Sequence, residues 1–289
     1  MLVIGGTGFI GRHLVRQIAS HGHSVAIYHR GLTPAALLPT VREITDSRSV
    51  MPISHFPPEL FEFDPNVVIL TVTMGEADAR AAVEAFTGRA DRIVLLSSGD
   101  VYWAYGRFMG IETGPIQKGL LTEEAPVRSK LYPYRHKASS PDVLEYWYEK
   151  ILAERAVLNA PIPATVLRLP KVYGPGSNAD LATVYRYREK RNWRWTHGFV
   201  ENVAAAVELA AVHPAAAGRI YNVGEAYTPT IAERLTWLPD TDIEPDRSSR
   251  SDFNQDIAYD TSRIRRELGY SEAVSEKEAA LKTLGADAK

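Results

Sequence analysis

The sequence lacks cysteine throughout its 289 residues. This absence excludes disulfides, thiolate metal ligands and cysteine nucleophiles. No apolar run approaches the roughly 18 residues that a membrane-spanning helix needs. Excess charge is also missing, because 35 acidic residues balance 33 basic ones for a net charge of -2. The chain therefore offers no global attraction to nucleic acid or to an anionic membrane. Its histidines show no metal-ligand spacing with carboxylates, so we expect no metal site.

The chain is expected to be cytoplasmic, because its first apolar strand begins at residue 1 and leaves no room for a signal peptide. Its length suits one sizeable α/β domain with a smaller lobe. Apolar runs alternate with helical patterns, which predicts a doubly wound parallel sheet covered on both faces. The strands are expected at residues 1–4, 25–28, 41–45, 67–72, 93–97 and 164–169, and helices at 77–86 and 143–158.

A glycine-rich turn directly follows the first strand. Gly5, Gly8 and Gly11 are spaced by three residues, with Thr7, Phe9 and Ile10 between them. This order of strand, turn and helix start is typical of a dinucleotide-binding site. The first glycine permits the tight turn, the second lets the backbone approach a pyrophosphate, and the third lets the helix pack closely on the strand. The free N–H groups at the helix start would hold the pyrophosphate.

Tyr146 is the one tyrosine of 14 with a lysine four positions later, Lys150. Both residues fall in the predicted helix 143–158, so their side chains are expected on one face, a turn apart. A cation beside a phenol favours the phenolate and makes the tyrosine a usable proton donor or acceptor near neutral pH. The alternative is that Tyr146 and Lys150 are an ordinary exposed tyrosine–lysine pair on a helix. Ser97 and Ser98, at the end of an upstream strand, supply a hydroxyl for the oxygen whose proton Tyr146 handles.

These motifs together resemble the extended short-chain dehydrogenase/reductase family, the NAD(P)-dependent epimerase/dehydratase group. The resemblance runs from Met1 to about Tyr270. It is carried by the glycine turn, by residues 97–102 (SSGDVY), by 146–150 (YWYEK) and by 167–176 (LRLPKVYGPG), with weaker matches at 199–204, 221–224 and 267–270.

The resemblance implies roles for individual residues. Ser98 takes the place of the substrate-binding hydroxyl, Tyr146 that of the catalytic acid/base, and Lys150 that of the lysine that holds the nicotinamide ribose. Asp46 and Ser47 would approach the adenine. The remaining expected cofactor contacts are Thr71 and Val72 after the fourth strand, and Pro170 and Val172 beside the nicotinamide.

It also implies the domain organisation. A dinucleotide-binding domain is expected at residues 1–171 and a smaller, discontinuous substrate lobe at 172–289. Part of the segment 196–224 would return to the main sheet. Relatives often form dimers through helices that flank the site, so a homodimer is possible for this chain as well.

Position 29 is where the family often carries an aspartate that binds the ribose of NAD, and this chain has His29 followed by Arg30. A guanidinium suits the 2′-phosphate of NADP. NADP is therefore the preferred cofactor and NAD the second choice. The alternative is that Arg30 is merely a solvated turn residue.

Two other positions depart from the family pattern. Lys171 stands where many relatives carry asparagine, and it either meets an anionic substrate group or points away. Relatives that dehydrate sugars carry two acidic residues directly after the serine or threonine, whereas this chain has Gly99 and then Asp100. The loss of one carboxyl group counts against a dehydratase, because elimination needs both an acid and a base. Asp100 and Tyr102 are expected to line the substrate pocket.

The stretch 185–197 combines five basic residues with tyrosine and tryptophan. Its arginines, Arg186 among them, would bind a nucleotide-sugar diphosphate in an enzyme. In a binding protein the same stretch would hold single-stranded RNA by charge and stacking. The third interpretation is a solvated cationic face with its tryptophans packed inward. The balanced net charge argues against a nucleic-acid partner.

The sequence thus predicts an NAD(P)-dependent oxidoreductase or epimerase that transfers hydride to or from a carbinol or carbonyl carbon. By resemblance, its small-molecule substrate is a sugar or nucleotide-sugar. The alternative hypothesis is a non-enzymatic NAD(P)-binding protein with an RNA-binding or redox-regulatory role.

Overall fold

The computed structural model describes residues 1–34, 37–47, 49–177 and 180–285. The chain forms two compact units from interleaved segments. Unit 1 contains Met1–Ser98, Leu131–Arg168 and Ala204–Tyr221. Unit 2 contains Gly99–Lys130, Leu169–Val203 and Asn222–Lys289. Residues 99–130 therefore belong to unit 2, although they precede the boundary at residue 171 that the sequence predicts. Among the described residues, no helix is both long and apolar enough to cross a membrane.

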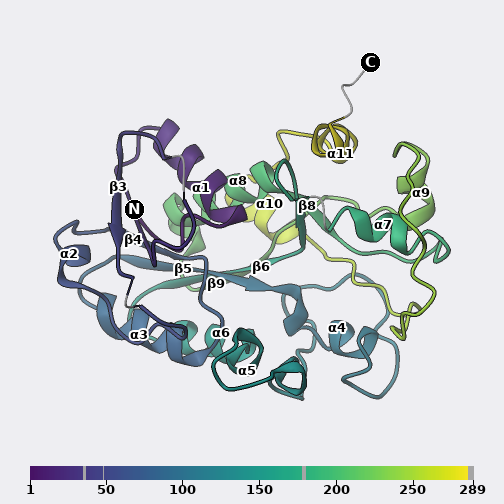
Figure 1. Cartoon of the computed structure of the whole chain (residues 1–289), viewed down its shortest axis with the longest axis horizontal. Helices are drawn as coiled ribbons and strands as arrows, with labels where there is room; N and C mark the ends of the chain where they lie inside the picture. Colours follow the sequence, from purple (N-terminus) through teal and green to yellow (C-terminus); the bar gives the residue numbers. More distant parts are fainter. Residues whose placement is uncertain (35–36, 48, 178–179, 286–289) are drawn as a thin grey trace. The chain divides into compact units, whose positions relative to one another are not determined.

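A seven-stranded parallel sheet of the Rossmann type forms the centre of unit 1, in the order β3-β2-β1-β4-β5-β6-β9 (Figure 1). Its strands are β1 (Leu2–Ile4), β2 (Val25–His29), β3 (Val41–Thr45), β4 (Val67–Leu70), β5 (Arg92–Ser98), β6 (Ala164–Leu169) and β9 (Arg219–Asn222). The predicted strands are confirmed within two residues at each end. Buried positions are continuous along β1 and β2, because helices cover both faces of the sheet.

Helices α1 (Phe9–Ser20) and α8 (Val200–Val212) cover one face of the sheet, and α3 (Glu76–Phe86) and α6 (Lys150–Leu158) cover the other (Figure 1). A hydrogen bond of 2.7 Å from Gln17 to Glu208 joins α1 to α8. The short elements α2 (Pro58–Phe61), α5 (Leu144–Trp147), η2 (Arg135–Lys137) and η3 (Pro214–Ala216) complete the unit.

The register of the sheet brings distant residues to one edge. Leu2 of β1 lies between Ala26 of β2 and Val68 of β4, and all three strands run parallel. Their carboxyl ends therefore meet at the edge where open α/β sheets bind ligands. The glycine turn follows β1 at this edge, beside the ends of β2 and β4.

The prediction of one helix over residues 143–158 was wrong. Tyr148 and Glu149 have extended backbone and separate α5 from α6. The reason lies in the fully buried Glu149, whose carboxylate accepts a hydrogen bond from the backbone N–H of Ile151 and so caps α6. The backbone N–H of Glu149 donates to Met74 O at 2.9 Å. These bonds make Glu149 the N-cap residue and fix the start of α6 at Lys150.

Unit 2 contains β7 (Lys171–Tyr173) paired in parallel with β8 (His197–Phe199). Its helices are η1 (Gly99–Val101), α4 (Trp103–Phe108), α7 (Ala182–Arg186), α9 (Ile231–Leu235), α10 (Ser262–Leu268) and α11 (Glu276–Leu284).

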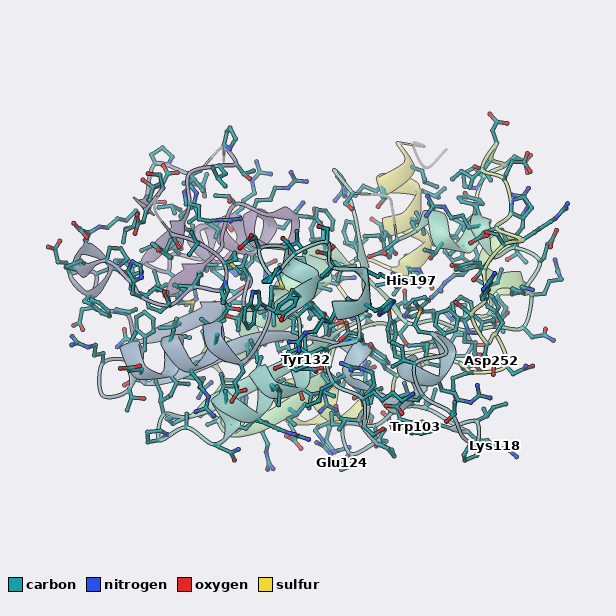
Figure 2. All side chains as sticks on the ribbon, turned by 60° about the horizontal axis from the view of Figure 1, so that its bottom comes forward. Trp103, Lys118, Glu124, Tyr132, His197 and Asp252 are labelled. Atoms are coloured by element: carbon teal, nitrogen blue, oxygen red, sulfur yellow. The ribbon has the colours of Figure 1, made fainter. Side chains whose placement is uncertain are left out.

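A buried charged cluster joins the elements of unit 2. Arg234 of α9, which has no exposed surface, forms ion pairs with Glu225 at 2.9 Å and with Glu276 of α11 at 2.5 Å. The guanidinium also contacts Nδ1 of His197, labelled in Figure 2, at 2.7 Å. Burial raises the pKa of Glu225 well above its usual value. Burial is the main reason why the pKa of His197 is lowered, and the positive charge of Arg234 lowers it further.

Candidate dinucleotide-binding and active site

The three glycines of the first turn meet three different surroundings. Gly5 has a φ of +95°, and a Cβ there would lie 2.3 Å from Cγ1 of Val72. At Gly11 a Cβ would lie 2.7 Å from the carbonyl oxygen of Gly5, so the helix contacts the turn directly. At Gly8 a Cβ would meet no atom within 4 Å. The turn is therefore tight at its first glycine, closely packed at its third, and open at its second.

The N-terminus of α1 faces this open space. Gly8 is its N-cap residue, no side chain caps its N–H groups, and its first turn contains no acidic residue. Uncapped N–H groups and the helix dipole together favour an anion at this position. These residues fit the pyrophosphate of a dinucleotide.

A cavity of about 350 Å³ lies beside the turn, entirely within unit 1. Six of the predicted cofactor residues line it: Gly5, Thr7, Gly8, His29, Arg30 and Val72. The other lining residues were not predicted from the sequence: Tyr28, Leu32, Thr33, Ser49, Met51, Ile53, Met74, Asp142 and Leu144. Most of these come from loops with no periodic pattern, which is why sequence reasoning missed them.

His29 and Arg30 differ in their surroundings at the end of β2. Nδ1 of the buried His29 accepts a hydrogen bond from the backbone N–H of Gly31, and Nε2 lies 2.8 Å from the carboxylate of Glu43. Both ring nitrogens are thus engaged by the protein. Arg30 is exposed and forms no ion pair with any described residue, so its charge is available at the cavity.

Three of the expected cofactor residues lie beside the cavity lining rather than in it. Asp46 is buried, and its backbone N–H donates to the carbonyl of His29. Ser47 is exposed, and Ser49 of the same loop lines the cavity instead. Thr71 donates its hydroxyl to the carbonyls of Ile4 and Gly5, so it ties β4 to the turn.

Lys150 lies at the ends of two central strands. Its ammonium donates to the carbonyl of Thr73 at 2.5 Å and to that of Leu96 at 3.0 Å, and its residue is only 5% exposed. It therefore places a buried positive charge at the carboxyl edge of the sheet, between the segment that follows β4 and the last residues of β5.

The two serines at the end of β5 have different surroundings. The hydroxyl of Ser97 donates to Glu154 at 2.5 Å, and Glu154 forms a buried ion pair with Arg168 at 2.8 Å. This network holds β5, α6 and β6 together. Ser98 is the last residue of β5 and is half-buried.

Tyr146 does not share a helical face with Lys150, because the chain breaks between α5 and α6. The ring of Tyr146 lies under the guanidinium of Arg135, 4.6 Å from the ring centroid. It also contacts Trp147 edge-on at 5.0 Å. Arg135 carries no motif in the sequence, so its proximity to Tyr146 could not have been inferred.

In unit 2, Gly99 is enclosed by a residue from much later in the chain. A Cβ at Gly99 would lie 1.3 Å from the hydroxyl oxygen of Tyr259. That hydroxyl donates to the carbonyl of Leu169 at 3.3 Å. The Tyr259 ring packs on the fully buried Tyr102, 5.8 Å between centroids. The glycine at position 99 is thus required by Tyr259, a packing constraint that no local motif reveals.

The predicted substrate residues of unit 2 are spread over several surroundings. Asp100 is 5% exposed, and Tyr102 donates its hydroxyl to the Asn222 side chain at 2.6 Å. Lys171 forms an ion pair with Asp180 at 3.0 Å. The cofactor candidates Pro170 and Val172 flank Lys171 and belong to unit 2 as well.

The basic and aromatic stretch 185–197 has its tryptophans inside. Trp193 and Trp195 are 3% and 7% exposed, and Trp193 stacks on Phe108 with 4.9 Å between centroids. Arg186 ends α7 and is exposed. Buried tryptophans offer no face for base stacking, so the arrangement matches a solvated cationic surface with inward-packed tryptophans.

Comparison with known proteins identifies the family. Residues 1–224 match the model of the NAD dependent epimerase/dehydratase family. The chain belongs to this family. The 2'-dehydrokanamycin reductase of Streptomyces kanamyceticus is 27% identical over 62% of this chain and 45% of its own length. The mouse sterol-4-alpha-carboxylate 3-dehydrogenase, decarboxylating, is 27% identical over 73% of this chain and 59% of its own length. The chain thus spans about half the length of these curated relatives.

A solved structure extends the likeness over nearly the whole chain. MoeE5 in complex with UDP-glucuronic acid and NAD has a TM-score of 0.69 and covers 99% of this chain and 97% of its own. Its sequence identity is 20%, so the likeness establishes the fold.

Proposed function

We propose that this protein is an NADP(H)-dependent reductase or epimerase that acts on a nucleotide-sugar. The observation that carries the proposal is the cavity at the uncapped start of α1, open at Gly8 and bordered by Arg30. Family membership supports a nicotinamide dinucleotide as its occupant. A nucleotide-sugar is supported by MoeE5, whose structure contains UDP-glucuronic acid and NAD.

The N-terminus of α1 would bind the pyrophosphate, and Lys150 would hold the nicotinamide ribose at the carboxyl edge of the sheet. When bound, the nicotinamide supplies hydride transfer to or from a substrate carbon. Tyr146 would give its phenolic proton to the substrate oxygen, or take it back, while Ser98 donates a hydrogen bond to that oxygen. One hydride transfer would complete a reductase cycle, and two would complete an epimerase cycle.

NADP(H) is proposed over NAD because of the charges at the end of β2. The carboxylate of Glu43 is engaged by His29, whereas the Arg30 guanidinium is unpaired among the described residues and borders the cavity. A guanidinium binds a phosphate through two parallel hydrogen bonds. Arg30 would therefore contact the 2′-phosphate of the adenosine ribose.

Fluorescence titration with NADPH and NADH tests this assignment. We expect tighter binding of NADPH, and we expect Arg30→Ala to lower NADPH affinity by roughly 10- to 100-fold, from the ~1.5–3 kcal/mol of a charged hydrogen bond. NADH affinity should stay unchanged. Arg16→Ala is the matched control, because Arg16 is an exposed arginine on α1 outside the cavity lining. Equal affinities of the parent protein for the two cofactors would overturn the NADP assignment.

Turnover is tested with UDP-glucose, UDP-galactose and UDP-glucuronic acid in the presence of NADP⁺ or NADPH. Nicotinamide absorbance reports net redox turnover, and chromatography of the sugar products reports epimerisation. A protein that binds NADPH but converts none of these sugars would favour the non-enzymatic alternative. Salt-sensitive binding of single-stranded RNA would then identify an RNA-binding role.

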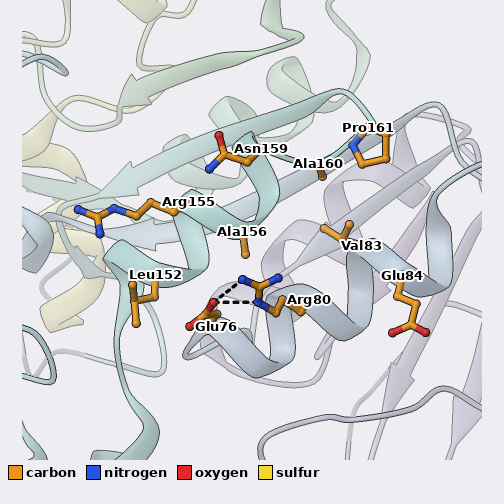
Figure 3. Close-up of a pocket in the computed structure, with 10 residues that line it drawn as sticks. All are labelled: Glu76, Arg80, Val83, Glu84, Leu152, Arg155, Ala156, Asn159, Ala160 and Pro161. Carbon is orange, nitrogen blue, oxygen red and sulfur yellow. Dashed lines mark hydrogen bonds and ion pairs between the residues drawn. The ribbon is translucent and has the colours of Figure 1, made fainter.

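We also propose a homodimer formed through α3 and α6. These helices border a surface groove of about 570 Å³ (Figure 3). Arg80 pairs with Glu76 at 2.7 Å, whereas Glu84 and Arg155 are exposed without a described ion-pair partner at opposite ends of the groove. Two-fold symmetry would bring Glu84 of one copy to Arg155 of the other. Sedimentation should show a dimer that Arg155→Glu weakens and the swap Glu84→Arg/Arg155→Glu restores. A monomeric parent protein would contradict this.

A further inference from the structure

Arg135 contacts Tyr146 in two ways. The centre of its guanidinium lies 4.6 Å from the ring centroid of Tyr146 and 3.5 Å from that of Tyr132, which is labelled in Figure 2. Its Nε donates a hydrogen bond of 3.0 Å to the carbonyl oxygen of Tyr146. The guanidinium is thus placed between two tyrosine rings and tied to the backbone of α5.

The charge of Arg135 is directed at these rings. Among the described residues no carboxylate forms an ion pair with Arg135, and the side chain is partly buried. An unneutralised cation over an aromatic face is attracted by the ring quadrupole, more strongly where water is partly excluded. Lys150, which the sequence pairs with Tyr146, donates instead to the carbonyls of Thr73 and Leu96. Arg135 is thus a cation in direct contact with the Tyr146 ring.

The position of Arg135 is fixed from the start of α6. Tyr132 has a φ of +56°, a conformation that non-glycine residues adopt only when their surroundings enforce it. Its backbone N–H donates to Glu149 at 2.5 Å, through the same buried carboxylate that caps α6 at Ile151. The backbone N–H of Arg135 then donates to the carbonyl of Tyr132 at 3.2 Å. This chain of bonds connects the residue beside Lys150 to the guanidinium over Tyr146.

We propose that Arg135 is a positioning residue that holds the ring of Tyr146 for proton transfer and supplies the positive charge beside it. The inference rests on the proposed acid/base role of Tyr146. Arg135, which belongs to no sequence motif, would then perform part of the role that the sequence predicts for Lys150.

The test compares Arg135→Gln with Arg135→Lys, in the parent protein and in the Tyr146→Phe background. Turnover is measured with whichever of UDP-glucose, UDP-galactose or UDP-glucuronic acid the parent converts, and NADPH affinity by fluorescence. We expect Arg135→Gln to lower kcat by about tenfold, with unchanged KM and NADPH affinity. Arg135→Lys retains the charge and should recover part of that loss. Lys137→Gln, which removes an exposed cation from the same turn, is the control.

The double mutant separates positioning from a purely structural role. If Arg135 acts through the Tyr146 hydroxyl, Arg135→Gln should cause no further loss in Tyr146→Phe. An equal loss in both backgrounds would overturn the inference, as would unchanged kcat in Arg135→Gln. If Arg135→Gln does not fold, the same comparison with Arg135→Lys decides. Full turnover by Tyr146→Phe alone, or no turnover by the parent protein, would refute the proposed function instead.

Discussion

Two alanine substitutions in the glycine turn should separate cofactor binding from folding. Gly8 has a φ of -73°, which any residue adopts, and a Cβ there would meet no atom within 4 Å. Gly11 is different, because its Cβ would lie 2.7 Å from the carbonyl oxygen of Gly5 and 2.9 Å from two atoms of Gly6. The same added methyl group should therefore have opposite consequences at the two positions.

The expected magnitudes follow from these surroundings. At Gly8, alanine is a poorer N-cap by roughly 0.5–1 kcal/mol, and the reduced entropy of the unfolded chain offsets this by about 0.4–1 kcal/mol. Stability should stay near that of the parent. At Gly11 the contacts are with backbone atoms that cannot rotate away, so overpacking should cost about 1–3 kcal/mol. For a chain of this size each kcal/mol corresponds to roughly 2–4 °C in Tm.

Thermal unfolding and NADPH titration measure the two effects separately. Gly8→Ala should keep its Tm and lose NADPH affinity, because its methyl group enters the space beside the uncapped start of α1. Gly11→Ala should lower the Tm in the absence of cofactor. If Gly8→Ala bound NADPH as tightly as the parent protein, the pyrophosphate would not lie at this turn. An unchanged Tm for Gly11→Ala would refute the packing argument.

Three further predictions concern catalysis, a buried carboxylate and a packed glycine. Tyr146→Phe should lower turnover by ~10²–10⁴ while NADPH affinity stays unchanged; full activity would disprove its acid/base role. Burial raises the pKa of Glu225 above its usual 4.5, so its contribution to stability is complete below that pH and is lost as the pH rises. Denaturant unfolding should thus show the stability of the parent falling, relative to Glu225→Gln, as the pH rises above the usual 4.5; a pH-independent difference would contradict this. Gly99→Ala should destabilise the protein by roughly 2 kcal/mol or more, since the Tyr259 hydroxyl lies 1.3 Å from the added Cβ. Adding Tyr259→Phe should relieve part of this loss of stability; if the losses of the two single variants simply added in the double mutant, this clash would be excluded.

Local patterns determine the parts of the fold that the sequence predicts. The apolar runs of β1 and β2 and the glycines at 5, 8 and 11 specify strand, turn and helix through neighbouring residues alone. The sheet edge at which they meet follows from the parallel connections. This is why residues that the sequence assigns to cofactor binding line one cavity in the structure: Gly5, Thr7, Gly8, His29, Arg30 and Val72.

Long-range packing determines the parts that the sequence does not predict. The helix break before Lys150 depends on Glu149, whose carboxylate bonds to Tyr132, 17 residues earlier. Tyr259 reaches Gly99 from a segment with no periodic pattern. Such pairings leave no trace in spacing or periodicity, because either partner alone looks like an ordinary polar or aromatic residue.

A crystal structure with NADP⁺ tests the central claim most directly. The account predicts the pyrophosphate at the N-terminus of α1 beside Gly8, with the 2′-phosphate bound by Arg30. It also predicts the nicotinamide ribose within hydrogen-bond distance of Lys150. A cofactor bound elsewhere, or a 2′-phosphate that points away from Arg30, would contradict it.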